Sequence, residues 1–297
     1  MKRIQYVDTL KALAIFTVVV GHVFCFTWNK YYDNIWNHLI SAYNMPLFFF
    51  LSGIFAKDDM RFGHLRKKVI QLLLPYMVVG GIFAFMNDGL FELVFAPAKF
   101  GYWFLPALFV FFCLFYLRSI MVRLIKRRIS KKDGVIVSFD VTFAVLCWLA
   151  AKVCVKFMPE DMSSLFCLNH VAYGHGLFFV AGFLFGKYHE AVEVAVAKKK
   201  ELIYFVSMLG FLMSLWVVFY SGIDVSRIGR LILGMFSIPV LIQFFKPVTL
   251  SGILGKIVSF VGTHTLHIYV LHYFFIPKTY LVPAVFGGGK SAISLCG

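Results

Sequence analysis

Lys11 and His22 are two ionisable residues in the first long apolar stretch of the chain, residues 9–28. Eleven steps of 100° bring both side chains to nearly the same face of an α-helix, roughly 16 Å apart along its axis. Ionisable side chains in such a stretch are rare and are functional candidates by default. Lys11 has a structural alternative, because its long side chain can reach a polar surface or pair with Asp8. The imidazole of His22 is too short for this, so we interpret His22 as functional.

A second polar cluster lies in a late apolar stretch, residues 257–275, which contains His264, Thr265, His267, Tyr269 and His272. His264 and His267 are three residues apart and share a helix face, as two metal ligands would. Carboxylate or cysteine ligands at suitable spacing are missing, so we predict that no metal is bound. Hydrogen bonds between helices are the alternative role for one or two of these residues. Three histidines in one stretch favour a functional site.

His175 lies between two glycines, which permit close approach of a neighbouring helix or a ligand. Asp140 and Arg230 are further ionisable residues in apolar stretches, and the sequence leaves open whether they pair inside the protein or extend to a polar surface. A phosphate-loop interpretation of residues 289–291 fails because the required glycine at position 284 is Ala284. The chain has no G-x-S-x-G or H-E-x-x-H motif, which argues against a soluble-type serine hydrolase or zinc protease.

The composition shows which elements must position these residues. Hydrophobic residues make up 61% of the 297 residues, charged residues 14%, and the mean hydropathy is +0.83. Soluble domains are about half apolar and about a quarter charged, so lipid must be the main solvent of this chain. About nine apolar segments are long enough to cross a membrane as helices. We therefore predict an all-α bundle with segments near residues 9–28, 38–56, 69–86, 102–122, 135–155, 171–186, 202–220, 228–245 and 257–275.

The formal net charge of +15 has two interpretations, a nucleic-acid partner or basic cytoplasmic loops. If the N-terminus is cytoplasmic and the segments alternate, 20 of the 29 basic residues fall on the inner side. The largest inner group contains Arg118, Arg123 and five further residues up to Lys132. Basic residues concentrate on the cytoplasmic side of membrane proteins. We therefore predict a cytoplasmic N-terminus, inner loops that face anionic lipid of the bilayer, and no nucleic-acid partner.

Several short motifs in a fixed order make the chain resemble the acyltransferase-3 family of multi-pass bacterial membrane proteins. In the first helix of that family a basic residue, usually Arg, precedes a His by eleven positions, and here Lys11 and His22 take these places. Further similar motifs are M-P-L-F-F-F-L-S-G at residues 45–53, the basic residues 66–68 followed by L-P-Y at 74–76, Y-W-F-L at 102–105, and G-T-H-T-L-H-I-Y-V-L-H at 262–272. The last of these corresponds to a family helix that ends in Tyr-x-x-His. Together the motifs extend over nearly the whole chain.

Two features depart from the family pattern. The polar residue that frequently precedes W-F-L is replaced by Gly101 and Tyr102. The family also usually has a further helix after the Tyr-x-x-His segment, whereas here only a short tail follows. We therefore expect residues 1–297 to form a single acyltransferase-3-like membrane domain, located in the bacterial cytoplasmic membrane, that lacks this helix.

The resemblance implies transfer of an acyl group, commonly acetyl, from acyl-coenzyme A to a hydroxyl of a carbohydrate or lipid-linked sugar. The residues fit such a reaction, because a neutral imidazole can remove the proton of a sugar hydroxyl during attack. We assign this role to His22. Covalent transfer through His22 remains an alternative.

The remaining candidates would bind the two substrates. Lys11, Arg66, Lys67 and Lys68 are candidates for binding the anionic phosphates of coenzyme A, and Tyr269, His272 and His175 for orienting the acceptor. A proton-coupled transporter or flippase is the main alternative function, since intramembrane His and Lys also suit proton coupling. Such proteins often contain repeated halves, and the absence of a repeat here favours the enzyme. A purely structural membrane protein fits the ionisable residues poorly.

Overall fold

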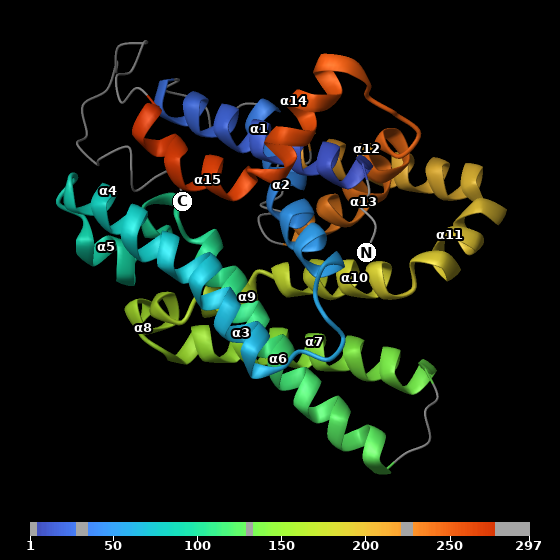
Figure 1. Cartoon of the computed structure of the whole chain (residues 1–297), viewed down its shortest axis with the longest axis horizontal. Coiled ribbons are helices and arrows are strands. Elements are labelled where there is room, and N and C mark those ends of the chain that lie inside the picture. The colour runs from blue at the N-terminus through green and yellow to red at the C-terminus, as the bar shows by residue number, and fades with distance from the viewer. Residues whose placement is uncertain (1–4, 28–34, 129–132, 221–227, 277–297) are drawn as a thin grey trace. The chain divides into compact units, whose positions relative to one another are not determined.

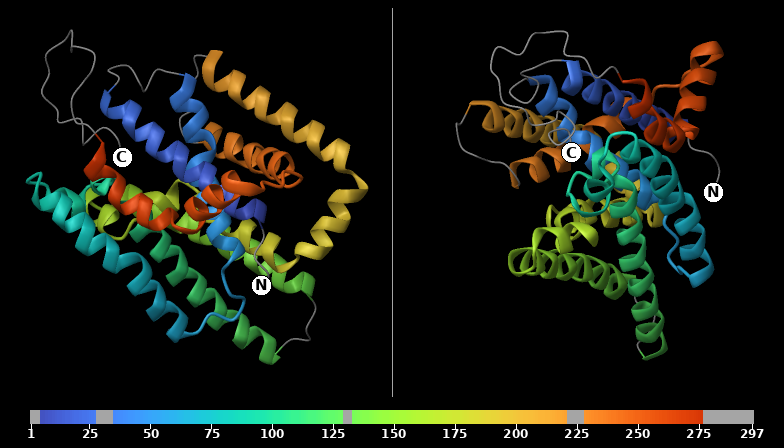
Figure 2. Two further views of the ribbon diagram at one scale, coloured as in Figure 1. Left: turned by 45° about the horizontal axis from the view of Figure 1, so that its top comes forward. Right: turned by 90° about the vertical axis from the view of Figure 1, so that its left-hand side faces the viewer.

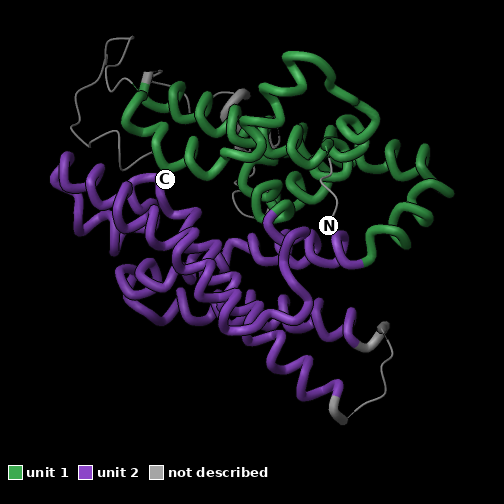
Figure 3. The backbone as a smooth tube through the Cα atoms, viewed as in Figure 1, with its two compact units in different colours: residues 1–51, 188–289 green, residues 52–187, 290–297 purple. Residues whose placement is uncertain are grey.

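The computed structural model describes residues 5–27, 35–128, 133–220 and 228–276 (Figure 1). Helices account for the regular structure of these residues, and none of them forms a strand. The all-α prediction is therefore confirmed for this part of the chain. The described residues form two compact units (Figure 3): unit 1 contains the described residues between 5 and 51 and between 188 and 276, and unit 2 those between 52 and 187.

Unit 1 is built around α1, which is continuous from Gln5 to Thr27. α1 lies against α13, α14 and α15, and α12 runs beside α13 (Figure 2). Gly262 of α14 permits a close approach to α1, because a Cβ at this position would lie 2.2 Å from the backbone oxygen of Asp8. The helices of unit 1 are α1 (Gln5–Thr27), most of α2 (Ile35–Ile54), α11 (His189–Lys198), α12 (Lys200–Tyr220), α13 (Ile228–Phe245), α14 (Gly252–Thr263) and α15 (Thr265–Phe275).

The late apolar segment is bent by 66° between α14 and α15, and His264 is the residue at the bend. Nδ1 of His264 lies 2.8 Å from the backbone oxygen of Phe260, and the two rings stack with centroids 4.2 Å apart. The oxygen of Phe260 also accepts the backbone N–H of His264, so the ring adds a further bond to the last turn of α14. His264 therefore stabilises the bend between the two helices.

Unit 2 contains a core of phenylalanine rings between α6 and α10. Phe112 and Phe115 of α6 meet the ring of Phe179 edge-on, with centroids 5.2 and 5.6 Å away. Gly53 lets the end of α2 touch α10, since a Cβ there would lie 2.0 Å from the oxygen of Phe179. The elements of unit 2 are α3 (Phe62–Lys68), η2 (Val69–Leu73), η3 (Tyr76–Gly80), α4 (Gly81–Phe85), α5 (Leu90–Phe95), η4 (Lys99–Gly101), α6 (Phe104–Arg128), α7 (Asp133–Phe157), α8 (Glu160–Leu165), α9 (Leu168–Ala172) and α10 (His175–Lys187).

Residues 62–85 of unit 2 form one continuous apolar span in which the helix type changes. Two π-helical turns, η2 and η3, lie on either side of Pro75, between α3 and α4. Proline has no backbone N–H, so it removes a hydrogen bond from the helix at this point. A local change of helix type is the usual way to accommodate such a gap.

Five described helices are long and apolar enough to cross a membrane, and the bent pair α14–α15 makes a sixth candidate span. Three shorter apolar helices cover residues 43–54, 175–187 and 231–245, so each of the nine predicted segments overlaps a helix. Phe157, Ile253 and Phe275 are more than three-quarters exposed. Apolar side chains so exposed on apolar helices are those expected to face lipid. The multi-helix membrane architecture is thus confirmed, while the count of nine spans and the orientation stay predictions.

Three sequence features fall outside this description. The predicted absence of a further helix concerns residues 277–297, which the structure does not describe, and the glycine-lysine segment at residues 289–291 lies there too. The side chain of Arg230 also lies outside the described part, so its role stays open.

Candidate functional site

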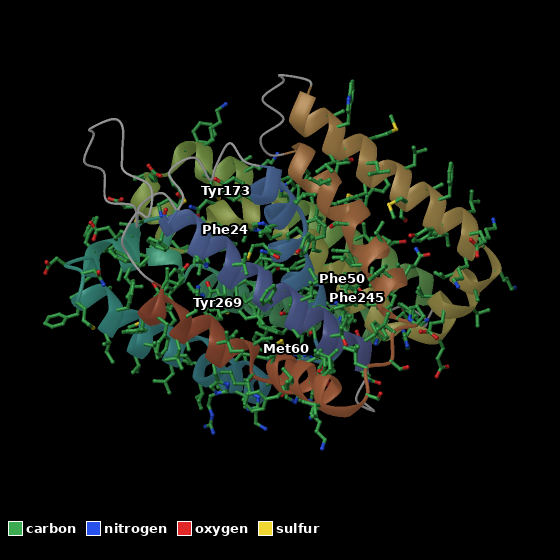
Figure 4. All side chains as sticks on the ribbon, turned by 90° about the horizontal axis from the view of Figure 1, so that it is seen from above. Phe24, Phe50, Met60, Tyr173, Phe245 and Tyr269 are labelled. Carbon is green, nitrogen blue, oxygen red and sulfur yellow. The ribbon has the colours of Figure 1, made fainter. Side chains whose placement is uncertain are left out.

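His22 of α1 forms the centre of a hydrogen-bonded cluster with α15 in unit 1. Its Nδ1 lies 2.9 Å from Nε2 of His272, and the two rings stack with centroids 5.0 Å apart. The hydroxyl of Tyr273 lies 3.0 Å from Nε2 of His22. Nδ1 of His272 lies 2.6 Å from the backbone oxygen of Tyr269. These contacts form one continuous chain of hydrogen bonds. The two helices that contribute to it lie side by side, and Figure 4 labels Tyr269 on α15 and Phe24 on α1.

The ends of this chain determine where the protons lie. A backbone oxygen only accepts, so Nδ1 of His272 must donate to Tyr269. A neutral imidazole carries one N–H, which leaves Nε2 of His272 as an acceptor. His22 therefore donates from Nδ1, and its own Nε2 is an acceptor that receives the hydroxyl proton of Tyr273. The geometry thus places a basic lone pair on Nε2 of His22.

The cluster lies in a largely water-free environment. Tyr269, His272 and Tyr273 are each no more than 5% exposed, while His22 is half-buried. Hydrogen bonds are electrostatically stronger in such surroundings than in water. An unpaired polar group would be costly there, and each ring nitrogen of the two histidines has a partner. The site holds His22 in one tautomer and one orientation.

Lys11 lies on the same helix as His22, about three turns before it. Because α1 is unbroken, eleven residues still correspond to a rotation of about 20° beyond three full turns. The predicted placement of both residues along one side of α1 therefore holds. Lys11 is half-buried, and Asp8 is 8% exposed. A role of Lys11 in binding a phosphate stays a prediction.

His175 belongs to a different cluster, in unit 2. The ring of Trp103 stacks on that of His170, with centroids 4.1 Å apart and planes 8° from parallel, and His175 lies 5.6 Å from Trp103. Nε2 of His170 lies 3.1 Å from the oxygen of Pro97 and must donate to it. Burial, with a smaller contribution from His175, lowers the pKa of His170 to about 3, so His170 is neutral at pH 7. Unit 2 thus contains a neutral aromatic cluster of its own.

The three basic residues of α3 differ in their environment. Arg66 and Lys67 are exposed, whereas Lys68 is half-buried. Nζ of Lys68 lies 4.6 Å from the ring centre of Phe112 and 3.2 Å from Oε1 of Gln71. Lys68 therefore also packs against α6, while Arg66 and Lys67 present their charges to the surroundings.

The environment of Arg118 differs from the prediction, in which Arg118 belonged to the basic residues of an inner loop. It is 1% exposed in α6 and binds both carboxylate oxygens of Asp140, at 2.6 and 2.7 Å. A third bond, of 2.7 Å, reaches Oδ1 of Asp58. The loop prediction was wrong for this residue, because its guanidinium is satisfied by two carboxylates inside unit 2. The same contact answers the open question about Asp140, which pairs inside the protein.

Asp58 joins this buried pair to the protein surface. Its Oδ2 lies 3.2 Å from Nζ of Lys187, and its side chain is 36% exposed. Partial burial raises the pKa of Asp58, but the hydrogen bond and charge of Arg118, together with Lys187, lower it by more. Asp58 is therefore ionised at neutral pH and, because Nζ of Lys126 also lies 3.8 Å from its Oδ2, closes a five-residue ion-pair network.

Sequence reasoning missed Tyr273 as a partner of His22. The signal was present, because residues 269, 272 and 273 have the i, i+3, i+4 spacing that places side chains on one helix face. Because the family motif is Tyr-x-x-His, Tyr269 was predicted as the functional tyrosine instead. In the structure Tyr269 contributes its backbone oxygen to the chain, and the hydroxyl comes from Tyr273.

Comparison with known proteins adds one result to this geometry. A family model described as an acyltransferase domain, that of the acyltransferase-3 family, matches residues 4–280. No curated protein and no solved structure matches the chain. The family match covers nearly all the described residues of both units, including His22 and all of α15. The chain therefore belongs to the acyltransferase-3 family and is a membrane acyltransferase.

Proposed function

We propose that this acyltransferase transfers an acetyl or other acyl group from acyl-coenzyme A to a hydroxyl of a cell-surface or secreted carbohydrate. In this proposal the chain is a single domain of about nine spans in the bacterial cytoplasmic membrane, with its N-terminus inside. The excess of basic residues on that side of the chain supports the orientation.

One observation carries the proposal, namely the lone pair on Nε2 of His22. A hydroxyl is a weak nucleophile until a base removes its proton during attack. His22 is held as the Nδ1–H tautomer by its bond to His272, and that ring is held in turn by the backbone of Tyr269. This arrangement is what a general base needs, because the accepting nitrogen is fixed in place before the reaction.

The reaction balances with His22 as the base that holds the proton. As the acceptor oxygen bonds to the thioester carbon, its proton moves toward Nε2 of His22. The tetrahedral intermediate then collapses, the carbon–sulfur bond breaks, and the imidazolium returns its proton to the departing thiolate. The products are an ester and coenzyme A, and His22 is neutral again. No covalent enzyme intermediate is needed, so labelled donor without acceptor should leave no label on the protein.

Four cations are proposed to bind the phosphates of the donor. Lys11 lies on the His22 side of α1, and Arg66 and Lys67 are exposed on α3. Lys68 would contribute through its charge while its side chain packs against Phe112. Guanidinium and ammonium groups are the usual protein ligands of phosphate.

Three side chains are proposed to orient the acceptor. Tyr269 and His272 lie on α15 next to the base, and His175 stacks with the aromatic cluster of unit 2. Aromatic rings with a polar edge suit a sugar, which presents both apolar C–H faces and hydroxyls.

A proton-coupled transporter or flippase is the second candidate function, and the 66° bend between α14 and α15 favours it. Broken helices are common in transporters, where the free helix ends bind the substrate. Here His264 bonds a carbonyl of the last turn of α14, so part of that end is occupied by the protein itself. The family match favours the enzyme.

The test uses purified protein in nanodiscs, labelled acetyl-coenzyme A and host glycan extract. We expect transfer of label to glycan, with a loss of about 10²–10⁴-fold in His22→Ala because a general base is removed. His267→Ala is the matched control, since His267 is an exposed histidine of α15, the helix that contributes His272 and Tyr273. Full activity in His22→Ala would reject the assignment of the base. Movement of a substrate across vesicles without label transfer would favour the transporter.

A further inference from the structure

Tyr273 occupies the one position on His22 that the proposed chemistry needs. Its hydroxyl lies 3.0 Å from Nε2, the nitrogen whose lone pair would accept the proton of the acceptor. An imidazole nitrogen has a single in-plane lone pair and takes one strong hydrogen bond. An acceptor hydroxyl must therefore either replace the phenol or react through it.

The surroundings of Tyr273 argue against replacement. The residue is 3% exposed, and its ring lies 4.0 Å from that of His272 and 4.9 Å from that of His22, measured between centroids. The neighbouring rings fill the space into which the phenol would have to turn, since protein interiors are packed as densely as organic crystals.

We propose that Tyr273 relays the proton of the acceptor hydroxyl to His22. This inference rests on the proposed acyl transfer and names the path of its proton. The acceptor hydroxyl donates to the phenolic oxygen of Tyr273, and the phenolic hydroxyl donates to Nε2 of His22. Both links are ordinary hydrogen bonds, and the second is present in the structure.

The relay balances as two proton transfers in one step. As the acceptor oxygen attacks the thioester, its proton passes to the oxygen of Tyr273 while the proton of Tyr273 passes to Nε2 of His22. Tyr273 is neutral before and after the step. A concerted transfer is required, because a free tyrosinate would be unfavourable next to an imidazole: phenol has a pKa of about 10 and imidazole about 6.5. The reverse relay delivers the proton to the leaving thiolate.

The relay gives His272 a defined place in the chain. When His22 becomes an imidazolium, its Nδ1–H still donates to Nε2 of His272, 2.9 Å away. His272 cannot turn, because its own Nδ1–H is bonded to the oxygen of Tyr269. His272 is therefore a positioning residue, and Tyr273 is the group in contact with the substrate.

The first measurement needs only the native protein. Single-turnover acyl transfer is followed in mixtures of light and heavy water, and the rate is plotted against the deuterium fraction. Two protons moving in one step give a curved plot, and one proton gives a straight line. A straight line for the native protein overturns the relay and leaves acyl transfer by His22 intact.

The second measurement uses Tyr273→Phe, which removes the hydroxyl and keeps the ring. We expect the single-turnover rate to fall about 10- to 100-fold, the lower part of the range for lost acid–base catalysis. The KM for the donor should stay unchanged and the plot should become straight. Tyr204→Phe is the matched control, because Tyr204 is an exposed tyrosine of α12 in the same unit.

The outcomes separate the two hypotheses. If Tyr273→Phe transfers label as fast as the native protein, or faster, the phenol only occupies the position that the acceptor hydroxyl takes during the reaction. This result overturns the relay. A slower variant whose plot stays curved assigns Tyr273 a structural role, which also overturns it. Absence of any label transfer by the native protein rejects the proposed function and the relay together. If Tyr273→Phe does not fold, fluorotyrosine is incorporated at position 273 in its place. Its phenol is more acidic, so the relay predicts a changed transfer rate.

Discussion

Replacing Arg118 with methionine should strongly destabilise unit 2, because it breaks a buried ion pair. The guanidinium is 1% exposed and makes two bonds to Asp140, which is also 1% exposed, and two to Asp58, one to Oδ1 and one to the backbone oxygen. Methionine is long enough to fill much of the same space. It removes the charge, however, and leaves the carboxylate of Asp140 buried and without its guanidinium.

The magnitude follows from the burial of the two carboxylates. Removing one partner of a buried ion pair costs about 3–5 kcal/mol, because the remaining charge loses its compensation. Asp58 adds little, since it is 36% exposed and keeps Lys187 at 3.2 Å. The double variant Arg118→Met, Asp140→Leu removes both buried charges. It should recover most of the loss, because apolar replacements of buried pairs are often neutral.

The assay is unfolding of the purified protein in mixed micelles by a denaturing detergent, with the free energy of unfolding as the readout. Arg123→Met is the matched control, because it makes the same change on the same helix to a residue that is 41% exposed and paired with an exposed Asp59. We expect no measurable change for this control. The reasoning fails if Arg118→Met is as mild as Arg123→Met, or if the double variant is as unstable as the single one.

Three further outcomes are expected. Gly262→Ala should lower the thermal stability and the transfer activity, because its Cβ would lie 2.2 Å from the oxygen of Asp8 and push α14 from α1, whereas Gly63→Ala has open space and should change neither. The double variant Arg66→Ala, Lys67→Ala should raise the KM for acyl-coenzyme A without changing the unfolding temperature, since both side chains are exposed. Asp58→Asn should make the free energy of unfolding less dependent on pH in acid. The lowered pKa of Asp58 means that its carboxylate stabilises the folded protein above the ordinary carboxyl pKa of about 4. This stabilisation is lost as the pH falls through the lowered pKa. Unfolding curves between pH 7 and pH 3 check this.

The apolar segments were predictable because a helix in lipid must bury or satisfy every backbone group by itself. Segment length and composition therefore identify helices without knowledge of their partners. The bend at His264 was not predictable in the same way. Residues 257–275 contain no proline that would indicate a break in the helix. The 66° bend, and the bond between His264 and the oxygen of Phe260, are seen only in the structure.

The site was predictable in part of its members, His22 and His272, and not in its connections. Spacing alone placed Lys11 and His22 on one side of the first helix, and α1 is unbroken as that argument requires. The bond between His22 and His272 joins residues 250 positions apart. No local pattern specifies such a pair, because it depends on how α1 and α15 pack. Arg118 was misplaced for the same reason, since its two carboxylate partners lie on other segments.

The hydrogen-bond chain ends on a backbone oxygen, that of Tyr269. This explains how His272 can orient His22 as a base inside a membrane protein. A carboxylate in the place of the Tyr269 oxygen would also fix the tautomer of His272, but burying that charge would cost several kcal/mol. A backbone oxygen has two lone pairs, so the Tyr269 oxygen can bind Nδ1–H of His272 as well as a helical N–H. The site is therefore oriented without any resting charge. Positive charge appears only while the proton of the acceptor resides on His22, and it is shared with His272 through the 2.9 Å bond.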